Sequence, residues 1–347
     1  MRSLHCPTCH ARVYFENDRC LTCGTALGFE PGSFTMAPTS SPIGGGGAPG
    51  DPTGWVACAN RAVATCNWVV PADAAGSLCR SCSLTRTRPS DGDVEGHRWF
   101  VEAEAAKRRL VAQLLDLGLP VVGFAEKPEG LGFDLLTSRF DAVTTGHEDG
   151  LITVDLAEAD DAHRERVRNE LGEAYRTVLG HFRHEVGHYY WMVLVRDGGH
   201  LDDFRRCFGD ERVDYDAAMR SHYGGPGPVA WANTHVSAYA TMHPWEDWAE
   251  TFAHTLHILD ALQTAAATGL TVISRDVPGG VVAPGDVEGR PFDQVVEQWI
   301  PLAAALNALN RSMGEGDLYP FVLSATVIEK MAFVDRLVRG RQGAAAA

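Results

Sequence analysis

Apolar residues in the middle of the chain recur every three or four positions, the spacing that places them along one side of an α-helix. The pattern runs from Leu171 to Tyr190. It predicts a helix that is buried along that side. Its members include Ala174, Val178, Phe182, Val186 and Tyr190.

Further segments show the same helical spacing. An amphipathic helix is expected over about 95–117, and two more lie near the C-terminus, over about 295–309 and 323–338. His243-Pro244 opens another, because proline is favoured in the first turn of a helix. Trp, Ala and Phe then recur at helical spacing as far as His254. The pattern predicts a large, mainly helical domain in the second half of the chain.

Between residues 121 and 156, short apolar runs alternate with glycine and proline, which predicts a small sheet. If the last run formed an edge strand, it could pair with an extended peptide, whereas an internal strand could not. The pattern leaves both arrangements open. The runs are Val121–Phe124, Phe133–Leu136 and Leu151–Leu156.

The central helical segment contains His184-Glu185-Val186-Gly187-His188. Four residues advance a helix by roughly 400° and 6 Å, so both imidazoles leave the same face and can bind one zinc ion. Glu185 lies about 100° around from His184, where a general base for a metal-activated water is needed. The motif predicts two ligands and a catalytic base. The alternative is a solvated helix with two incidental histidines.

A hydrolytic zinc site needs a third protein ligand and an open fourth position. Glu246 and Glu250 share one face of the helix that follows His243, as in zincins whose third ligand is a glutamate and whose next acid bonds a ligand histidine from outside. We therefore assign Glu246 as ligand and Glu250 as the acid behind it, although spacing alone leaves the reverse open. Tyr239 precedes this helix; it either donates to the oxyanion or packs in the core.

Eight of the nine cysteines fall into two sets of four. The first set consists of two C-x-x-C pairs separated by ten residues, which is typical of a zinc ribbon. The second set is spaced more loosely but also predicts a four-thiolate zinc site. The first set is Cys6, Cys9, Cys20 and Cys23; the second is Cys58, Cys66, Cys79 and Cys82.

The alternative for both sets is a disulfide framework, which requires an oxidising compartment. The start of the chain, Met1 to Cys6, contains no apolar segment of the kind found in signal peptides. No run approaches the roughly 18 apolar residues of a membrane span. We therefore expect a cytoplasmic protein with reduced, metal-bound thiolates.

The net charge of the 347-residue chain is −15, and it is unevenly distributed. Residues 1–90 contain 7 Arg and 5 acidic residues, a balance of +2, so the remainder carries −17. Two zinc ions on eight thiolates would make the first part slightly negative. The charge therefore argues against nucleic acid as a partner of the ribbons.

Composition suggests the domain boundaries. A zinc ribbon is expected over 1–30, and a flexible linker rich in Gly, Pro, Ser and Thr over 31–54. A second four-cysteine module follows over 55–90, and the large domain over 91–340. Residues 341–347 are expected to form a disordered tail.

The cysteine pairs, Cys66-Asn67-Trp68, the string from Gly180 to Trp191 and the string from Val236 to His254 together resemble a family of bacterial zinc-binding metallopeptidases with an N-terminal zinc ribbon. The likeness covers nearly the whole chain. It implies a zincin-like catalytic domain of class α+β, with a small mixed sheet and active-site helices. It also implies that His184, His188 and Glu246 bind the metal and that Glu185 is the general base.

These features lead to the expectation of a zinc-dependent peptidase that hydrolyses peptide bonds through a metal-activated water, with a Glu as general base. One catalytic and two structural Zn²⁺ ions are expected. The partners would be a peptide or protein substrate and a protein that binds the zinc ribbons, with no role for a membrane. The alternative is an adaptor or regulator whose ribbons bind a protein or nucleic acid and whose zincin fold is a scaffold.

Overall fold

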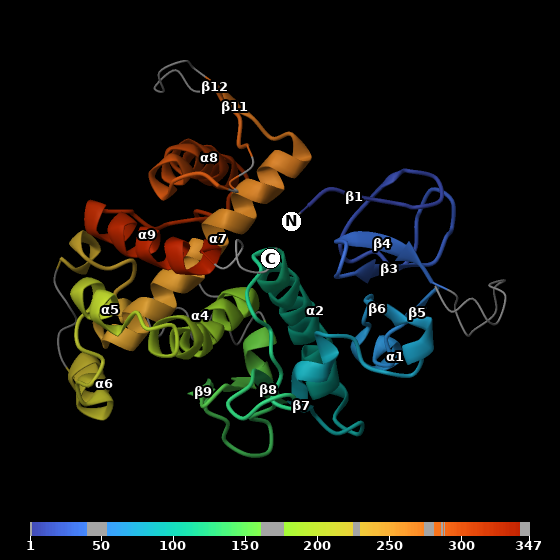
Figure 1. Ribbon diagram of the computed structural model, residues 1–347, viewed down its shortest axis with the longest axis horizontal. Helices are drawn as coiled ribbons and strands as arrows, with labels where there is room; N and C mark the ends of the chain where they lie inside the picture. Colours follow the sequence, from blue (N-terminus) through green and yellow to red (C-terminus); the bar gives the residue numbers. More distant parts are fainter. Residues whose placement is uncertain are drawn as a thin grey trace. The chain divides into compact units, whose positions relative to one another are not determined.

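The computed structural model describes residues 2–39, 54–160, 177–224, 230–273, 281–285, 287 and 289–340 (Figure 1). The chain divides into two units by the contacts between its residues. The N-terminal unit holds the described residues of Arg2–Asp116 and Pro120–Arg164, and the C-terminal unit holds those of Leu117–Leu119 and Glu165–Ala347.

The first cysteine module is built from two antiparallel strand pairs. β1 (Leu4–His5) pairs with β2 (Arg12–Val13), and β3 (Leu27–Glu30) pairs with β4 (Thr35–Pro38). The second hairpin crosses the boundary expected at residue 30, so residues 31–39 are not linker. The reason is that Met36 and Ala37 are apolar and buried, while the glycine and proline of this stretch form the turn. The rest of the predicted linker, 40–53, lies outside the described residues.

The second cysteine module packs directly on the first. Its strands β5 (Trp55–Ala57) and β6 (Val69–Pro71) are antiparallel and are joined through the short helix α1 (Arg61–Ala64). Trp68 is fully buried, with its ring centroid 5.2 Å from that of Phe29. The Phe29 amide also donates to the Asn67 carbonyl at 2.8 Å. The two modules therefore share one aromatic core.

A four-stranded mixed sheet follows, with α2 (Val94–Asp116) in the same unit. The strand order is β7-β8-β10-β9, in which the first three strands are parallel and β9 is antiparallel to β10. The helix and the mixed sheet agree with the expectation from the pattern. β7 comes from the last residues assigned to the second cysteine module. The bounds are β7 (Thr85–Thr87), β8 (Gly132–Leu136), β9 (Gly146–Glu148) and β10 (Leu151–Asp155).

One predicted strand is wrong, and the arrangement that the pattern left open is resolved. Val121–Phe124 forms no strand and contributes only an isolated bridge between Gly123 and Leu131. β10 lies inside the sheet, between β8 and β9, so it cannot accept an extended peptide as an edge strand. The edge strand next to β10 is the three-residue β9. The apolar pattern of β10 reflects burial within the sheet.

The C-terminal unit is mainly helical, and α7 is its central helix. α7 contacts α4 on one side and α8 and α9 on another (Figure 1). α4 begins at Val178, where the Thr177 hydroxyl accepts the Gly180 amide; the earlier part of the predicted helix, 171–176, lies outside the described residues. The helices are α4 (Val178–Tyr190), the π-helical turn η4 (Trp191–Arg196), α5 (Leu201–Phe208), α6 (Tyr215–Gly224), α7 (Pro244–Thr268), α8 (Phe292–Ser312) and α9 (Ala325–Arg339).

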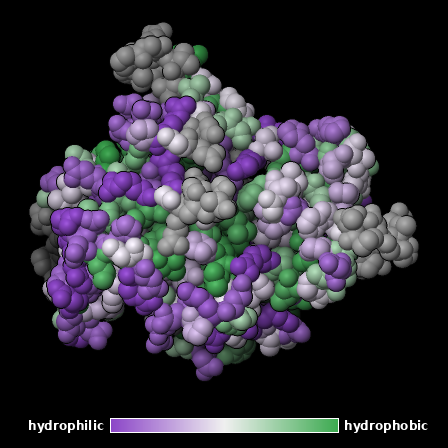
Figure 2. Space-filling model, in the orientation of Figure 1, coloured by the Kyte–Doolittle hydropathy of each residue, from purple (hydrophilic) through white to green (hydrophobic). Residues whose placement is uncertain are grey.

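Apolar side chains from α7, α8 and α9 form the core of this unit. Leu262, Val295 and Met331 are fully buried within it, one from each helix. Hydrophilic side chains cover the visible side of α5 and α6, in purple on the left of Figure 2. Short elements complete the unit: η5 (Trp231–Asn233), η6 (Tyr239–Thr241), β11 (Val272–Ile273) and β12 (Val281–Val282).

Among the described residues, no helix has the length and apolar character that crossing a membrane would require. The predicted tail, 341–347, lies outside the described residues.

Candidate metal centres

The catalytic candidate lies where α4 and α7 approach most closely. A Cβ atom on Gly187 would lie 3.0 Å from the Ala249 Cα, which is closer than side-chain carbons normally approach. The Trp248 indole of α7 also donates to the Gly187 carbonyl at 2.8 Å. Glycine at this position therefore lets the two backbones meet, and the side chains of one helix reach those of the other.

The start of α7 is fixed by His243 and Pro244. His243 Nδ1 accepts the Trp245 amide at 3.1 Å and caps the helix, and Pro244 takes its first position, as the sequence predicted. Because Nδ1 is an acceptor, Nε2 carries the proton and donates to the Val213 carbonyl at 3.0 Å. This capped first turn contains Glu246.

His184, His188 and Glu246 form one cluster. Their ligating atoms all lie within 4.8 Å of one another. His184 Nε2 is 3.0 Å from one Glu246 oxygen, and His188 Nε2 is 3.6 Å from the other. Glu246 is only 2% exposed, and a carboxylate buried between two imidazoles requires positive charge nearby. Two imidazoles and a carboxylate are a donor set that suits zinc, so the residues fit the ion.

Glu250 lies behind His184, on the side away from Glu246. Its Oε1 is 2.7 Å from His184 Nδ1, and its Oε2 accepts the Ser237 hydroxyl at 2.7 Å. Although burial raises the pKa of Glu250, the hydrogen bond and charge of His184 hold it at about 2. An ionised carboxylate on Nδ1 fixes the imidazole with Nε2 facing Glu246.

Glu185 is partly buried beside the cluster. Burial raises its pKa, and the charges of His184 and His188 lower it by a smaller amount, so the pKa stays above its ordinary value. A carboxylate whose protonated form is favoured in this way accepts a proton readily.

Two tyrosines complete the surroundings. The Tyr239 ring centroid lies 5.9 Å from that of His184, on η6. Tyr215, which the sequence analysis missed, donates from its hydroxyl to Glu246 Oε1 at 2.8 Å. Burial and the charge of Glu246 raise the pKa of both phenols, so both keep their protons. No spacing rule could find Tyr215, because this contact spans 31 residues and a loop.

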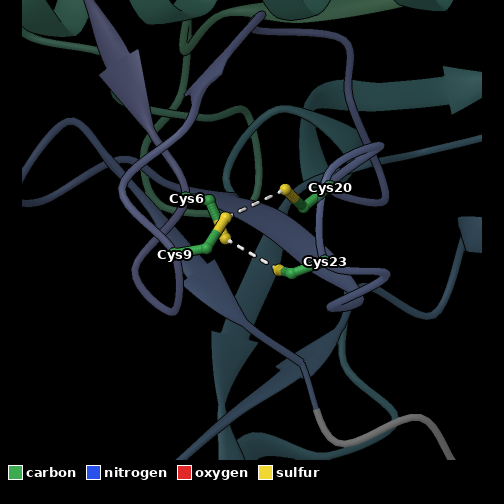
Figure 3. A group of neighbouring side chains, drawn as sticks. All are labelled: Cys6, Cys9, Cys20 and Cys23. Carbon is green, nitrogen blue, oxygen red and sulfur yellow. Dashed lines mark hydrogen bonds between the residues drawn. The ribbon is translucent and has the colours of Figure 1, made fainter.

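The first four cysteines converge from two tight turns (Figure 3). Cys6 Sγ is 3.6 Å from Cys23 Sγ, and Cys9 Sγ is 3.6 Å from Cys20 Sγ. All four are free thiols, and Cys23 is exposed to solvent. Four sulfurs at these distances can bind one zinc ion.

The second four cysteines also converge, although their spacing is looser. Cys66 Sγ is 3.7 Å from Cys79 Sγ, and the Cys79 amide donates to Cys58 Sγ at 3.2 Å. With Cys82 they form a second cluster in which every member is buried. Cys207 belongs to neither cluster.

A buried charged network adjoins this second cluster. Cys82 Sγ is 3.9 Å from a Glu104 oxygen, and Glu104 accepts from Lys107 Nζ at 2.6 Å. The side chains of Glu104 and Lys107 are both 0% exposed. Thr85, at the start of β7, also donates to Glu104 at 2.5 Å. The second cluster is therefore joined to α2 and the sheet, rather than forming an independent module.

Comparison with known proteins identifies the family. Residues 96–337 match a family model described as "Putative zinc-binding metallo-peptidase". The chain belongs to this metallopeptidase family. Residues 3–93 match a zinc-ribbon domain, so the resemblance seen in the sequence is confirmed over both parts. That match ends close to the expected boundary at residue 90.

Relatives of this protein occur in mycobacteria. Uncharacterized proteins of Mycobacterium bovis and of two strains of Mycobacterium tuberculosis are each 49% identical to it over 340 residues, which is 97% of this chain and 95% of theirs. No solved structure matches the chain. The family supports zinc binding and a peptide or protein substrate in general terms.

Proposed function

We propose that the protein is a zinc-dependent peptidase that hydrolyses peptide bonds with Glu185 as general base. One observation carries the proposal: His184, His188 and Glu246 meet within 4.8 Å, while Glu250 holds the far side of His184 at 2.7 Å. A helix with two incidental histidines would have neither a buried carboxylate facing both rings nor an acid fixing one of them. The family match supports the same class of activity.

In this proposal His184, His188 and Glu246 hold the zinc ion. When bound, zinc supplies Lewis acidity, which lowers the pKa of a water molecule and polarises a peptide carbonyl. Glu185 accepts the proton of the attacking water and returns it to the departing amine. Tyr239 donates a hydrogen bond to the carbonyl oxygen as negative charge develops on it. Glu250 keeps His184 oriented throughout.

The two cysteine clusters would each hold one structural zinc ion, giving about three per chain with the catalytic ion. The charge of −17 over the residues after 90 does not favour nucleic acid as a partner. All the cysteines are free thiols, and eight of them lie in clusters that bind zinc only when reduced. We therefore also propose a cytoplasmic location, because reduced thiols persist there.

The first cysteine module offers a surface for a protein partner. Leu21 is 91% exposed and lies within the second C-x-x-C turn, and Tyr14 is 68% exposed. These side chains favour a role of the ribbon in binding a protein, in addition to peptide hydrolysis. If the protein acted only as an adaptor, Leu21→Ser would abolish its cellular function by removing partner binding, whereas Glu185→Gln would leave that function intact.

Glu185→Gln tests the peptidase proposal. The amide has nearly the same shape but cannot accept the proton, so the variant should keep its zinc and lose cleavage of a peptide library by 100-fold or more, on the order expected for a general base. Glu297→Gln, on the exposed face of α8, makes the same chemical change away from the site and should cleave like the wild type. Wild-type cleavage by Glu185→Gln would refute the mechanism.

A further inference from the structure

The two oxygens of the Glu246 carboxylate have different partners. Oε2 lies 3.0 Å from His184 Nε2, whereas Oε1 accepts the Tyr215 hydroxyl at 2.8 Å and lies 3.6 Å from His188 Nε2. A hydrogen bond to an ionised carboxylate is roughly twice as strong as one between neutral groups. Tyr215 therefore holds the oxygen that is more distant from its histidine nitrogen and leaves Oε2, the nearer one, without a bond from the phenol.

The backbone before Tyr215 is fixed to the start of α7. His243 Nε2 donates to the Val213 carbonyl at 3.0 Å, and its Nδ1 accepts the Trp245 amide at 3.1 Å. The Tyr215 ring packs edge-on against the His243 ring at 5.1 Å. One imidazole thus caps the helix that carries Glu246 and holds the segment that brings Tyr215 to it.

A residue of α9, Lys330, also bonds the first turn of α7. Lys330 Nζ donates to Asp247 Oδ2 at 2.6 Å and to the Thr234 carbonyl at 2.8 Å. Asp247 and Lys330 are both buried. The backbone of Glu246 is therefore fixed, and the direction of its carboxylate depends on the groups that bond to it.

One side of helix α6 faces the candidate metal centre. His222 follows Tyr215 by seven residues, about two helical turns, and so lies on the same side of α6. The His222 ring centroid is 6.1 Å from that of Tyr239, whose ring in turn lies 5.9 Å from His184. Tyr223, on the next position, is 59% exposed. One side of α6 thus contacts both Glu246 and Tyr239.

We propose that Tyr215 is a positioning residue for the third metal ligand. Its hydroxyl bonds Oε1 of Glu246, so that Oε2 would be the oxygen available to the metal. The inference rests on the proposed metal centre and names a residue that neither the motif nor the family match assigns. Without the phenol, both carboxylate oxygens would be free to compete for the ion and the side chain would lose its fixed direction.

The test compares Tyr215→Phe with Tyr223→Phe in the full-length, zinc-loaded protein. The Phe variant at 215 keeps the ring and its packing on His243 and removes only the hydroxyl. Removal of a group that orients a metal ligand typically weakens metal binding 10–100-fold. We expect this loss at the catalytic site of Tyr215→Phe, and affinity within about twofold of wild type for Tyr223→Phe, measured by competition with a chelator that leaves the thiolate-bound zinc in place.

Spectroscopy separates positioning from general destabilisation. Cobalt(II), placed in the catalytic site after selective removal of its zinc, reports coordination geometry through its visible bands. The Tyr215→Phe spectrum should change while the thermal midpoint of the metal-free protein stays that of wild type. Unchanged zinc affinity with an unchanged cobalt spectrum would overturn the proposal. Wild-type protein that binds zinc here but cleaves no peptide would refute the proposed function and leave the effect of Tyr215 measurable.

Discussion

Gly187→Ala places one methyl group at the closest approach of α4 and α7. The added Cβ would lie 3.0 Å from the Ala249 Cα and 3.3 Å from the Ala249 carbonyl oxygen. Both are backbone atoms, so no side-chain rotation relieves the contact and the helices must separate by a few tenths of an ångström. Overpacking of this kind costs about 1–3 kcal/mol.

An opposing effect comes from the helix itself. Replacing an interior helical glycine by alanine stabilises the helix by about 1 kcal/mol. The net loss in the free energy of unfolding should therefore be small, about 0–2 kcal/mol. The effect on the metal centre should be larger. Glu246 lies one turn before Ala249 on α7, and a shift of α7 moves its carboxylate away from His184. We expect zinc affinity at this site to fall about 10–100-fold.

The assay measures urea unfolding of the metal-free protein and zinc affinity of the loaded protein in parallel. Gly224→Ala is the matched control, because a Cβ at the last residue of α6 would meet nothing within 4 Å. That variant should keep wild-type zinc affinity. If Gly187→Ala instead bound zinc like the wild type and gained about 1 kcal/mol of stability, the close approach of the two helices would be refuted.

Three further predictions follow from the same geometry. Glu250→Gln should weaken zinc binding about 10–100-fold, because it removes the negative charge that faces His184 Nδ1. Wild-type affinity in this variant would show that the contact does not contribute to zinc binding. Lys107→Met should lower the free energy of unfolding by up to about 3–5 kcal/mol, because it removes the nearest positive charge from the buried Glu104 carboxylate and leaves it with Thr85 and the more distant Arg108. Lys127→Met, at an exposed position, should change it by less than about 0.5 kcal/mol. A thiol-reactive reagent should release zinc first from the cluster that contains Cys23, because that thiol is exposed to solvent. Earlier release from the fully buried cluster would show that exposure does not decide the order.

The parts of the site that depend on local sequence were predictable. Helical periodicity places His184 and His188 on one face, and His243-Pro244 marks the start of α7. Spacing could not decide which of Glu246 and Glu250 faces the metal, because both lie on one side of the helix. In the structure Glu250 bonds His184 Nδ1 and Glu246 lies beside Nε2, which supports Glu246 as the proposed ligand.

The missed features depend on contacts between distant segments. Tyr215, at the start of α6, and Ser237, in the loop before η6, bond the two acids, and no local rule links either residue to α7. Glycine and proline in 31–39 looked like linker because composition does not distinguish a tight turn from a flexible segment. The internal place of β10 depends on its partners β8 and β9, which the apolar run alone cannot identify.

Zinc content per folded chain, measured on the wild type and on His188→Ala, tests the central claim most directly. The account predicts about three zinc ions for the wild type and about two for the variant, with both thiolate clusters still loaded. Equal zinc content in the two proteins would contradict it, because the ion assigned to His184, His188 and Glu246 would then not depend on one of its ligands.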